Sequence, residues 1–487
     1  MHAEISRHKT AISRTEVSRP VRLALTDGVL RPEHTFFDYG CGLGDDQRLL
    51  AALGYQASGW DPVHRPDGRV EPANVVNLGY VLNVIERATE RADVLRRAWA
   101  LAQDVFIVSA RMKPDEHFQG ETRDFADGLL TSRGTFQKFF EQSELRVWID
   151  QVLGVSSVAA APGVFYVFRD EQARTTFLAS RFRRRIATPR LARSAELYKL
   201  HAEVLQPLMS FVGERGRVPA DDELSNIAEL RSVFGSIRKA FRIVIRATDA
   251  AQWDRIAEQR ALDLLIYLAL SRFETRPAFG HLSQELQRDV RGFFTTYKQA
   301  CENADGLLFE LRDQSLVESA CQISEIGKLT PTALYVHESA LDALSPLLRL
   351  YEGCARGYLG RIEDANLIKL HRQEPKISYL SYPRFEDDAH PAIASSVTVH
   401  LQTFRVKGRD FRLFRNPPVL HRKELFVQSD HPLHGKFERL TQAEERKGLY
   451  ARPEAIGTRD GWNQTLSAMG FMIRGHRLMR AKGTRSG

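Results

Sequence analysis

The stretch "HTFFDYGCGLGDDQRLLAALG", residues 34–54, decides the fold of the first part of the chain. Phe36 and Phe37 belong to a short apolar and aromatic run, which is typical of a buried strand. Three closely spaced glycines follow, and the leucines after them recur at helical spacing until Gly54 ends the pattern. The segment therefore predicts a strand, a glycine turn and a helix. Such a turn lets a ligand approach the main chain in front of a helix N-terminus.

The spacing of the glycines distinguishes two classes of cofactor site. Dinucleotide sites use the pattern G-x-G-x-x-G, whereas this turn has the pattern Asp38-x-Gly40-x-Gly42-x-Gly44. The second pattern resembles motif I of S-adenosylmethionine-dependent methyltransferases. The two aspartates that open the following helix would also repel a pyrophosphate, but not a cationic sulfonium. An ordinary strand-to-helix turn, with glycines at positive φ, is the alternative interpretation.

Two segments after the turn fit the methyltransferase pattern. "GYQASGWDP" (54–62) predicts a second strand ending at Asp61. An acidic residue there accepts hydrogen bonds from ribose hydroxyls in Rossmann-like sheets; an aspartate that merely starts a turn is the alternative. "ANVVNLGYVLNVIE" (73–86) predicts a strand over 75–78 and a helix near 80–86. It resembles the fourth strand and following loop of methyltransferases.

The next segments predict how the sheet is completed. "DVFIVSA" (104–110) predicts a fifth strand and "GTFQKFFEQ" (134–142) a helix. "LRVWID" (145–150) and "GVFYVFR" (163–169) resemble the antiparallel strand pair that ends this fold. Only residues 62–73 separate the second strand from the next one, which is too short for a helix, a strand and another helix. We therefore predict that the third strand is missing or shrunken.

The bulk composition is that of a large globular protein. The 487 residues suggest two to four domains, and 43% of them are hydrophobic, which is ordinary. No segment is long and apolar enough to cross a membrane, and the first residues have no secretory pattern. The four cysteines are scattered without a C-x-x-C pair, so we expect neither a metal site nor a disulfide framework. A reducing, cytoplasmic location is the simplest expectation.

Changes of pattern along the chain predict its organisation. We expect a Rossmann-like α/β methyltransferase domain over 1–170, shortened between its second and fourth strands, and a basic linker over 171–194. An all-α helical domain follows over 195–370, where apolar residues recur at helical spacing. A smaller α+β C-terminal domain occupies 371–487, where β-branched and aromatic residues become frequent.

The net charge of +8 is unevenly distributed. Basic residues cluster at the two termini and in "RFRRRIATPRLAR" (181–193), and such clusters suit contact with a polyanion. Residues 216–241 resemble small helical repeats that accompany homing endonucleases and bind DNA. Solvated linkers and a plain helical hairpin are the alternatives. The predicted nucleic-acid-binding residues are Arg181, Arg183, Arg184, Arg185, Arg190, Arg193, Arg238 and Lys239.

Several longer strings occur in a fixed order along nearly the whole chain. They are "HKTAISRTEVSRP", "FFDYGCGLGDD", "GWDPVHRP", "VVNLGYVLNVIE", "LDLLIYLALSRF", "KISYLSYPRF", "HPAI" and "NPPVLHRKE". Together they resemble the methyltransferases associated with bacterial DNA phosphorothioation. The resemblance implies a role in DNA modification or restriction defence. It also implies DNA, and proteins of the phosphorothioation system, as partners.

The motifs and the resemblance predict three groups of site residues. S-adenosylmethionine would be held by Asp38, Gly40, Gly42, Gly44, Asp61, Asn77 and Leu78. The acceptor would be oriented or deprotonated by Tyr80, Asn83 and Glu86, for which helix packing is the alternative. An N-terminal lid would bring His8, Lys9 and Arg14 to a phosphate or phosphorothioate, unless the terminus is simply frayed.

Three functions are compatible with this pattern. The leading hypothesis is a methyltransferase that acts on DNA or on a component of the phosphorothioation system. A cofactor-bound adaptor that transfers nothing is the second, because the sequence has no Asn-Pro-Pro-aromatic motif beside the glycine turn and no Pro-Cys nucleophile. The third is a methyltransferase for RNA or a small molecule.

Overall fold

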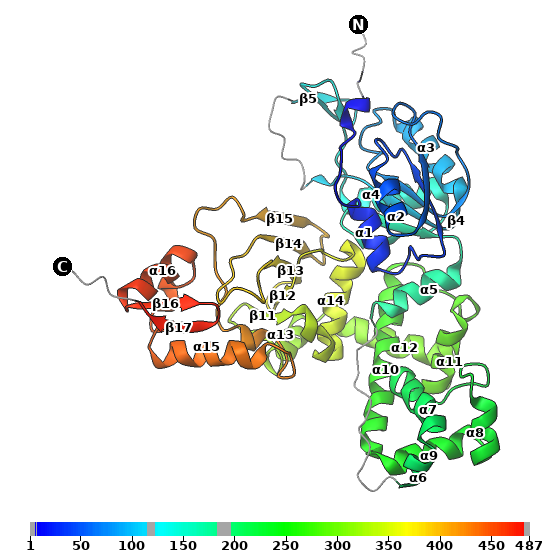
Figure 1. Cartoon of the computed structure of the whole chain (residues 1–487), viewed down its shortest axis with the longest axis vertical. Helices are drawn as coiled ribbons and strands as arrows, with labels where there is room; N and C mark the ends of the chain where they lie inside the picture. Colours follow the sequence, from blue (N-terminus) through cyan, green and yellow to red (C-terminus); the bar gives the residue numbers. More distant parts are fainter. Residues whose placement is uncertain (1–4, 6, 114–121, 183–195, 482–487) are drawn as a thin grey trace.

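The first part of the chain is an α/β domain built on a six-stranded sheet (Figure 1). The computed structural model describes residues 5, 7–113, 122–182 and 196–481. The strand order is β2-β1-β3-β4-β9-β8, and β9 alone runs antiparallel to its neighbours. The strands are β1 (Thr35–Tyr39), β2 (Gln56–Trp60), β3 (Ala73–Gly79), β4 (Ala102–Ser109), β8 (Val158–Ala161) and β9 (Val164–Phe168).

Helices cover both faces of this sheet, because its central strands are apolar on both sides. α1, α2 and α5 pack on one face, while α3 and α4 pack on the other. A small sheet of β5, β6 and β7 is inserted before α4. These elements are α1 (Arg19–Thr26), α2 (Asp45–Ala52), α3 (Ala88–Leu101), β5 (Thr122–Phe125), β6 (Gly128–Thr131), β7 (Phe136–Gln137), α4 (Gln142–Leu153) and α5 (Glu171–Ser180).

This topology confirms the Rossmann-like arrangement predicted for the first part of the chain. The predicted strand, glycine turn and helix are β1, residues 40–44 and α2. Residues 61–72 are all described, and none of them lies in a helix or an extended strand, so β2 leads directly to β3. The predicted loss of the third strand is therefore confirmed.

Three local predictions in this domain are wrong. Residues 80–86 form a turn rather than a helix, and α3 begins only at Ala88. Residues 134–142 contain the short strand β7 instead of a helix, and residues 145–150 lie within α4 instead of a strand. The antiparallel partner of β9 is β8, whose sequence "VAAA" has little intrinsic preference for strands. Short apolar runs do not distinguish helix from strand, so tertiary packing decided these segments.

Residues 196–322 form the helical part of the chain (Figure 1). The long helix α10 lies at its centre and contacts α7, α11, α12 and α14. The helices are α6 (Glu196–Leu200), α7 (Ala202–Arg215), α8 (Ile227–Phe234), α9 (Ile237–Ala247), α10 (Ala250–Leu270), α11 (Gln284–Phe293), α12 (Tyr297–Glu310) and α13 (Gln314–Gln322). Short 3-10 helices are η3 (Ser271–Phe273) and η4 (Phe279–His281).

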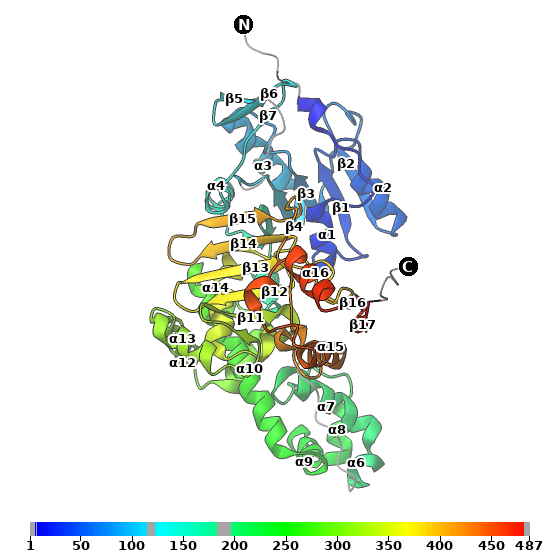
Figure 2. The same cartoon turned by 90° about the vertical axis from the view of Figure 1, so that its left-hand side faces the viewer.

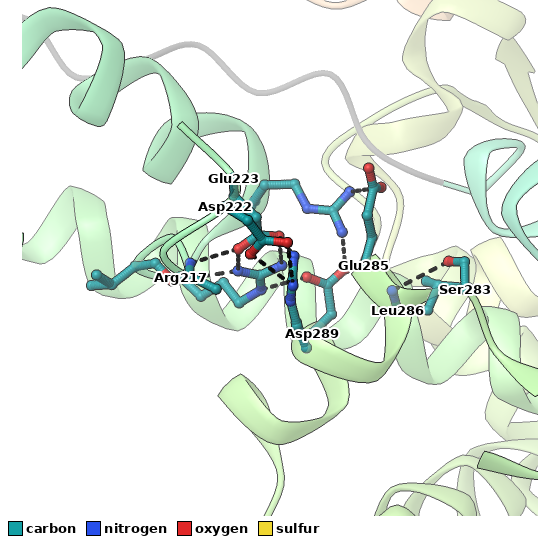
Figure 3. A network of polar contacts seen from close by, with 11 residues as sticks. Arg217, Asp222, Glu223, Ser283, Glu285, Leu286 and Asp289 are labelled. Atoms are coloured by element: carbon teal, nitrogen blue, oxygen red, sulfur yellow. Dashed lines mark hydrogen bonds and ion pairs between the residues drawn. The ribbon is translucent and has the colours of Figure 1, made fainter. Parts of the chain in front are cut away.

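A network of buried ion pairs holds the loop after α7 against α11 (Figure 3). The Arg217 guanidinium contacts Asp289 at 2.7 Å and Glu223 at 2.7 Å. Burial alone would raise the pKa of Glu223, but hydrogen bonds from Arg217 and from the Ala220 N–H outweigh it and lower the pKa to about 2. The acidic segment before α8 therefore has a structural role, because its carboxylates neutralise buried arginines.

A second, antiparallel sheet carries the C-terminal part of the chain. Its strand order is β10-β11-β12-β13-β14-β15, and α13 and α14 pack on one of its faces. The sheet starts at β10, so part of the region predicted to be all-α is strand. The elements are β10 (Lys328–Leu329), β11 (Ala333–His337), η5 (Glu338–Ala343), α14 (Pro346–Leu359), β12 (Leu367–His371), β13 (Lys376–Ser381), β14 (Ser395–His400) and β15 (Val406–Asp410).

A small α+β unit packs beside this sheet at the C-terminal end (Figure 2). Its hairpin, β16 paired with β17, lies against α15 and α16. The elements are η6 (Lys423–Phe426), α15 (His434–Arg446), η7 (Pro453–Ala455), α16 (Arg459–Ala468), β16 (Phe471–Arg474) and β17 (Arg477–Arg480).

The edge strand β8 of the first sheet is covered by the end of α14. The Arg361 N–H donates to the Ala160 carbonyl at 2.6 Å, and Gln142 donates to the Tyr358 carbonyl at 3.2 Å. Gly360 has φ +76°, and a Cβ there would collide with the main chain of Ala160. This close approach satisfies an otherwise unpaired sheet edge and fixes the α/β domain to the rest of the chain.

Candidate functional site

The glycine turn lies at the carboxyl edge of the first sheet, where β1 and β3 diverge. Gly40, Gly42 and Gly44 have φ of +82°, +53° and +81°, which is the left-handed region that favours glycine. The Gly40 N–H donates to the Trp60 carbonyl at 2.8 Å. A Cβ on Gly40 would lie 2.5 Å from a methyl carbon of Val81. The turn therefore requires glycine for both its conformation and its closeness to the loop after β3.

Asp61 faces this turn from the end of β2. Its carboxylate accepts a hydrogen bond from the Gly42 N–H at 3.1 Å. The other carboxylate oxygen accepts from the N–H groups of Val63 and His64, at 3.0 and 2.8 Å. One side chain thus holds the loop after β2 and stands against the glycine turn, as a ribose-binding carboxylate would have to.

Asp38 and Asn77 lie beneath the turn in the interior of the sheet. The Asn77 side-chain amide donates to the Asp38 carboxyl at 2.8 Å, and both residues are buried. Burial raises the pKa of Asp38 to about 7, and the nearby charge of Asp46 adds to this effect. Leu78 is fully buried in the core. These three residues support the floor of the site from below and do not line it.

A cavity of about 900 Å³ opens above the turn. Its walls come from the ends of β1, β2 and β3, from α3, and from the N-terminal segment. Gly40, Gly42 and Asp61 line it, and so does Cys41, whose thiol pKa burial raises to about 12. Gly44 does not line it, because it caps α2 and packs against Arg65. The volume is at the upper end of the range for small-molecule sites, which is roughly 300–1,000 Å³.

The N-terminal segment crosses the cavity and is held by ion pairs. Arg7, in the short 3-10 helix η1 (Arg7–Thr10), donates to Glu86 at 2.8 Å and to Glu90 at 2.5 Å. Ala11 lies over the turn, and a Cβ on Gly42 would be 3.4 Å from the Ala11 Cβ. Since Arg7, Thr10 and Ala11 line the cavity, this segment forms a strap across its mouth.

The three residues predicted for the lid lie in different surroundings. Arg14 lines the cavity, and its N–H donates to the carboxylate of Asp45 at 2.7 Å. Lys9 is exposed and does not line the cavity. The side chain of His8 lies outside the described part of the chain. The aspartates at the start of α2 therefore anchor the strap, because Asp46 likewise accepts a hydrogen bond from the Ser18 N–H at 2.6 Å.

Removing the ion pairs of Arg7 with Glu86 and Glu90 should release the strap. We expect Arg7→Ala to accelerate amide hydrogen exchange in residues 7–14 by about tenfold, because charge-assisted hydrogen bonds of roughly 1–2 kcal/mol are lost. Hydrogen exchange read by mass spectrometry measures this, with Lys9→Ala as the matched control on an exposed neighbour. Unchanged exchange in the Arg7 variant would show that the strap is held by other contacts.

The three predicted catalytic residues differ in their contacts and in their position relative to the cavity. Tyr80 lines the cavity at φ +59°, a strained conformation for a non-glycine residue. Asn83 is buried. Its side-chain oxygen accepts a hydrogen bond from the Arg111 N–H at 2.8 Å, and its side-chain NH2 group donates to the Lys138 carbonyl. Glu86 is paired with Arg7. The structure thus engages Asn83 and Glu86 in fixed contacts. Tyr80 contributes to the cavity wall, and its hydroxyl meets the Arg19 guanidinium.

Arg181 is half-buried against β8, where it donates to the Ala159 carbonyl at 2.7 Å and lies 3.9 Å from Asp27. These contacts within the domain engage its guanidinium and do not support the predicted contact with nucleic acid. Arg238 and Lys239 are exposed on α9. The other predicted arginines, Arg183, Arg184, Arg185, Arg190 and Arg193, lie outside the described residues.

Residues that sequence reasoning missed also line the cavity. Arg87, Arg97 and Arg111 stand at its walls together with Arg7 and Arg14. The three come from the start of α3, from its third turn and from the end of β4. No local pattern marks them, because only the fold brings them to one opening. Three acidic side chains line the same cavity, so the five arginines leave a small excess of positive charge. Such an excess suits an acceptor that carries phosphate or carboxylate groups.

Neither a metal cluster nor a membrane helix is found in the described ranges. No group of three or more His, Cys, Asp or Glu side chains converges there on a point that could hold a metal ion. None of the helices in those ranges has the length and apolar character needed to cross a bilayer.

Comparisons with known proteins add the following findings. No protein-family model matches the sequence, and no curated protein matches it. The CcbJ methyltransferase from Streptomyces caelestis matches in structure at 14% identity and a TM-score of 0.24, covering 33% of this chain and 93% of its own. SAM-bound CalS10, an amino pentose methyltransferase from Micromonospora echinaspora, matches at 12% identity and a TM-score of 0.26, with coverages of 34% and 94%.

The magnesium protoporphyrin IX methyltransferase from Synechocystis PCC 6803, solved with bound SAH, is another such structure. It is 15% identical, covers 34% of this chain and 93% of its own, and has a TM-score of 0.23. Similarity at this level says nothing of substrate. The assignment of the fold rests on the strand order and the glycine turn described above.

Proposed function

We propose that this protein is an S-adenosylmethionine-dependent methyltransferase. The observation that carries the proposal is the cavity at the carboxyl edge of the first sheet, where a bare glycine turn faces the carboxylate of Asp61. In Rossmann-like sheets, nucleoside cofactors bind at this edge, at the point where the strand order reverses. Here that point lies between β1 and β3.

The residues present fit this cofactor. Gly40 and Gly42 leave the main chain bare, Asp61 offers carboxylate oxygens to ribose hydroxyls, and Asp38 lies below the turn as a charge for the methionyl ammonium. S-adenosylmethionine, when bound, supplies a sulfonium methyl group whose departure leaves a neutral thioether. No acid is therefore needed to expel the leaving group, and the protein has to orient the reactants and exclude water.

The strap and Tyr80 are suited to these two tasks. Arg7, bound to Glu86 and Glu90, holds the segment over the glycine turn, where it would exclude water from a bound cofactor. Tyr80 is held at the cavity wall because its N–H donates to the Ser109 carbonyl at 3.1 Å. Its left-handed backbone and the contact of its hydroxyl with Arg19 hold Tyr80 at the wall of the space proposed for the acceptor.

As acceptor we propose DNA, or a component of the DNA phosphorothioation system. The resemblance of the long sequence strings supports this proposal, and the arginines around the cavity supply the charge that a phosphate-bearing acceptor needs. The partners would then be DNA and proteins of that system.

A transfer assay tests the proposed function. Purified protein is incubated with labelled S-adenosylmethionine and plasmid DNA, with and without phosphorothioate linkages, and label in the DNA is counted. We expect incorporation into DNA, and nucleosides from cells with and without the gene should differ by one methylated species in mass spectrometry. Calorimetry that detects no cofactor binding would refute the methyltransferase proposal.

A cofactor-bound adaptor is the second candidate. It is favoured by the engagement of Asn83 and Glu86 in fixed contacts, which leaves neither of them to take a proton from an acceptor. Such an adaptor would bind S-adenosylmethionine in calorimetry but transfer no label to DNA or to proteins of the system.

A further inference from the structure

The two faces of the sheet β10–β15 differ in chemistry. Apolar residues of one face pack on α13 and α14. On the other face, called the outer face here, the register aligns Lys369, Ser378, Thr398 and Lys407 in one row across four strands. Because strand side chains alternate with period two, Lys376, His400 and Arg409 share this face. Figure 2 looks onto the sheet with α14 behind it.

The outer face of β12–β15 is basic. The outward positions of these four strands, all of them described, include Lys369, Lys376, Lys407 and Arg409 but no aspartate or glutamate. Between the basic residues runs a chain of hydroxyl contacts, in which Ser378 lies 3.0 Å from His371 and 2.8 Å from Thr398. Leu367 and Leu380, at one end of the face, are covered by the C-terminal unit. Exposure then increases toward the edge strand: Ser378 is buried, Thr398 is half-buried, and Lys407 and Arg409 are exposed.

The edge strand and the loop after it extend this surface. Residues 404–415, "FRVKGRDFRLFR", hold five basic residues and one acid, Asp410, which pairs with Arg412 at 2.6 Å. The four other basic residues form no ion pair with a described carboxylate: Arg405, Lys407, Arg409 and Arg415. Aromatic rings accompany them. Phe404 packs on Tyr358 and is 43% exposed, and Phe414 lies 5.1 Å from the Arg409 guanidinium and is 41% exposed.

Edge protection alone does not account for this distribution. Isolated lysines suffice to keep an edge strand from pairing with another chain. Here the basic residues extend from the edge strand β15 across the sheet to Lys369 on β12, and along the chain after β15 to Arg415. Surfaces that bind nucleic acid combine basic side chains with exposed aromatic rings. The cations contact phosphates, and the bases stack on the rings.

The surface adjoins the α/β domain. The Tyr358 hydroxyl donates to the Phe404 carbonyl at 3.2 Å, and the Tyr358 carbonyl accepts from Gln142 at the start of α4. Just before α4, the Phe140 N–H donates at 3.0 Å to the carbonyl of Arg111, a residue of the cavity wall. This chain of contacts links the start of β15 to the part of the α/β domain that carries Arg111.

We propose that the outer face of β12–β15, together with residues 404–415, binds a nucleic-acid strand through its phosphodiester backbone. The inference deepens the proposed function by naming the surface that holds the DNA. It rests on the proposed function only for the claim that the bound DNA is the methyl acceptor. Phosphates contact Arg405, Lys407, Arg409 and Arg415, while Phe404 and Phe414 offer stacking faces for bases.

Fluorescence anisotropy tests this with the full chain and no cofactor. The probes are a labelled 30-nucleotide single strand and the matching duplex, titrated over a range of salt. The first variant, called the β15 variant, replaces Arg405, Lys407, Arg409 and Arg415 with glutamine. The matched control variant makes the same four-charge change at Arg242, Arg246, Arg255 and Lys298, which are exposed on α9, α10 and α12 and are not among the predicted nucleic-acid-binding residues.

We expect the β15 variant to lose at least about tenfold in affinity, and its slope of log K against log salt to become less steep by about three to four. The control variant should bind nearly as the wild type does. Equal losses in both variants, a loss in the control variant alone, or no binding of either probe by the wild type would overturn the proposal. The readout is independent of methyl transfer, so DNA binding without transfer would refute the proposed function and leave this surface standing. Unchanged cofactor binding by the β15 variant shows that it is folded.

Discussion

The Asp38→Asn variant should be more stable than the wild type above pH 7 and should bind S-adenosylmethionine more weakly. Asp38 is buried, and desolvation together with the charge of Asp46 raises its pKa to about 7 in the folded protein, against an ordinary value of 3.8. The native state therefore holds a proton that the unfolded chain has released. Asparagine keeps the shape and carries no charge, so it avoids the cost of ionising a buried carboxyl.

The sign of the pH dependence follows from linkage. A group whose pKa is raised on folding contributes its full stability below pH 3.8, and this contribution declines until the pH has passed 7. At 1.36 kcal/mol per pKa unit, the wild type should lose at most roughly 4 kcal/mol of unfolding free energy between about pH 4 and pH 8 through this group. The Asp38→Asn variant should lack this decline.

Cofactor affinity should have the opposite pH dependence, because binding favours the ionised form of Asp38. A methionyl ammonium above the turn favours the ionised carboxylate, so binding lowers the pKa of Asp38 and releases a proton below pH 7. Affinity in the wild type should therefore rise with pH up to about 7, and calorimetry in buffers of different ionisation enthalpy should detect the proton.

Urea unfolding at several pH values, together with this calorimetry, checks both effects. Asp104→Asn, an identical change at an exposed position, is the control. A wild-type stability curve that stays flat from pH 4 to pH 8, or equal cofactor affinity in the two proteins, would contradict the role of Asp38.

Asp61→Ala should weaken S-adenosylmethionine binding by roughly 10- to 100-fold, because hydrogen bonds to a charged group contribute about 1.5–3 kcal/mol. Alanine removes the acceptor for the ribose hydroxyls. It also removes the hydrogen bonds that hold Val63, His64 and Gly42 around the cavity.

Asp61→Asn separates these two contributions. Its side-chain oxygen can still accept from Val63 and His64, while its amide group cannot accept from Gly42 or from a ribose hydroxyl. We expect this variant to bind more tightly than Asp61→Ala but more weakly than the wild type. Calorimetry measures all three, and Asp67→Ala, at an exposed position of the same loop, is the control. Wild-type affinity in Asp61→Ala would place the ribose elsewhere.

Local signals were sufficient for the centre of the first domain. The three glycines, the apolar strand before them and the leucines after them predict β1, the turn and α2 without reference to anything distant. The short stretch 62–73 likewise predicts the missing third strand, because chain length alone excludes more elements there. The same signals failed for residues 134–150, where short apolar and aromatic runs suit a helix and a strand equally well.

The sequence by itself determined the glycine turn, the acidic residue after β2 and the order of the first strands, since each depends on residues that are neighbours in the chain. Only the tertiary structure decided the contacts of charged residues. It packed Arg181 against β8, paired Arg7 with Glu86 and Glu90, and aligned Lys369 with Lys407 across a sheet. The environment of a charge is set by groups far away along the chain, and no local pattern carries that information.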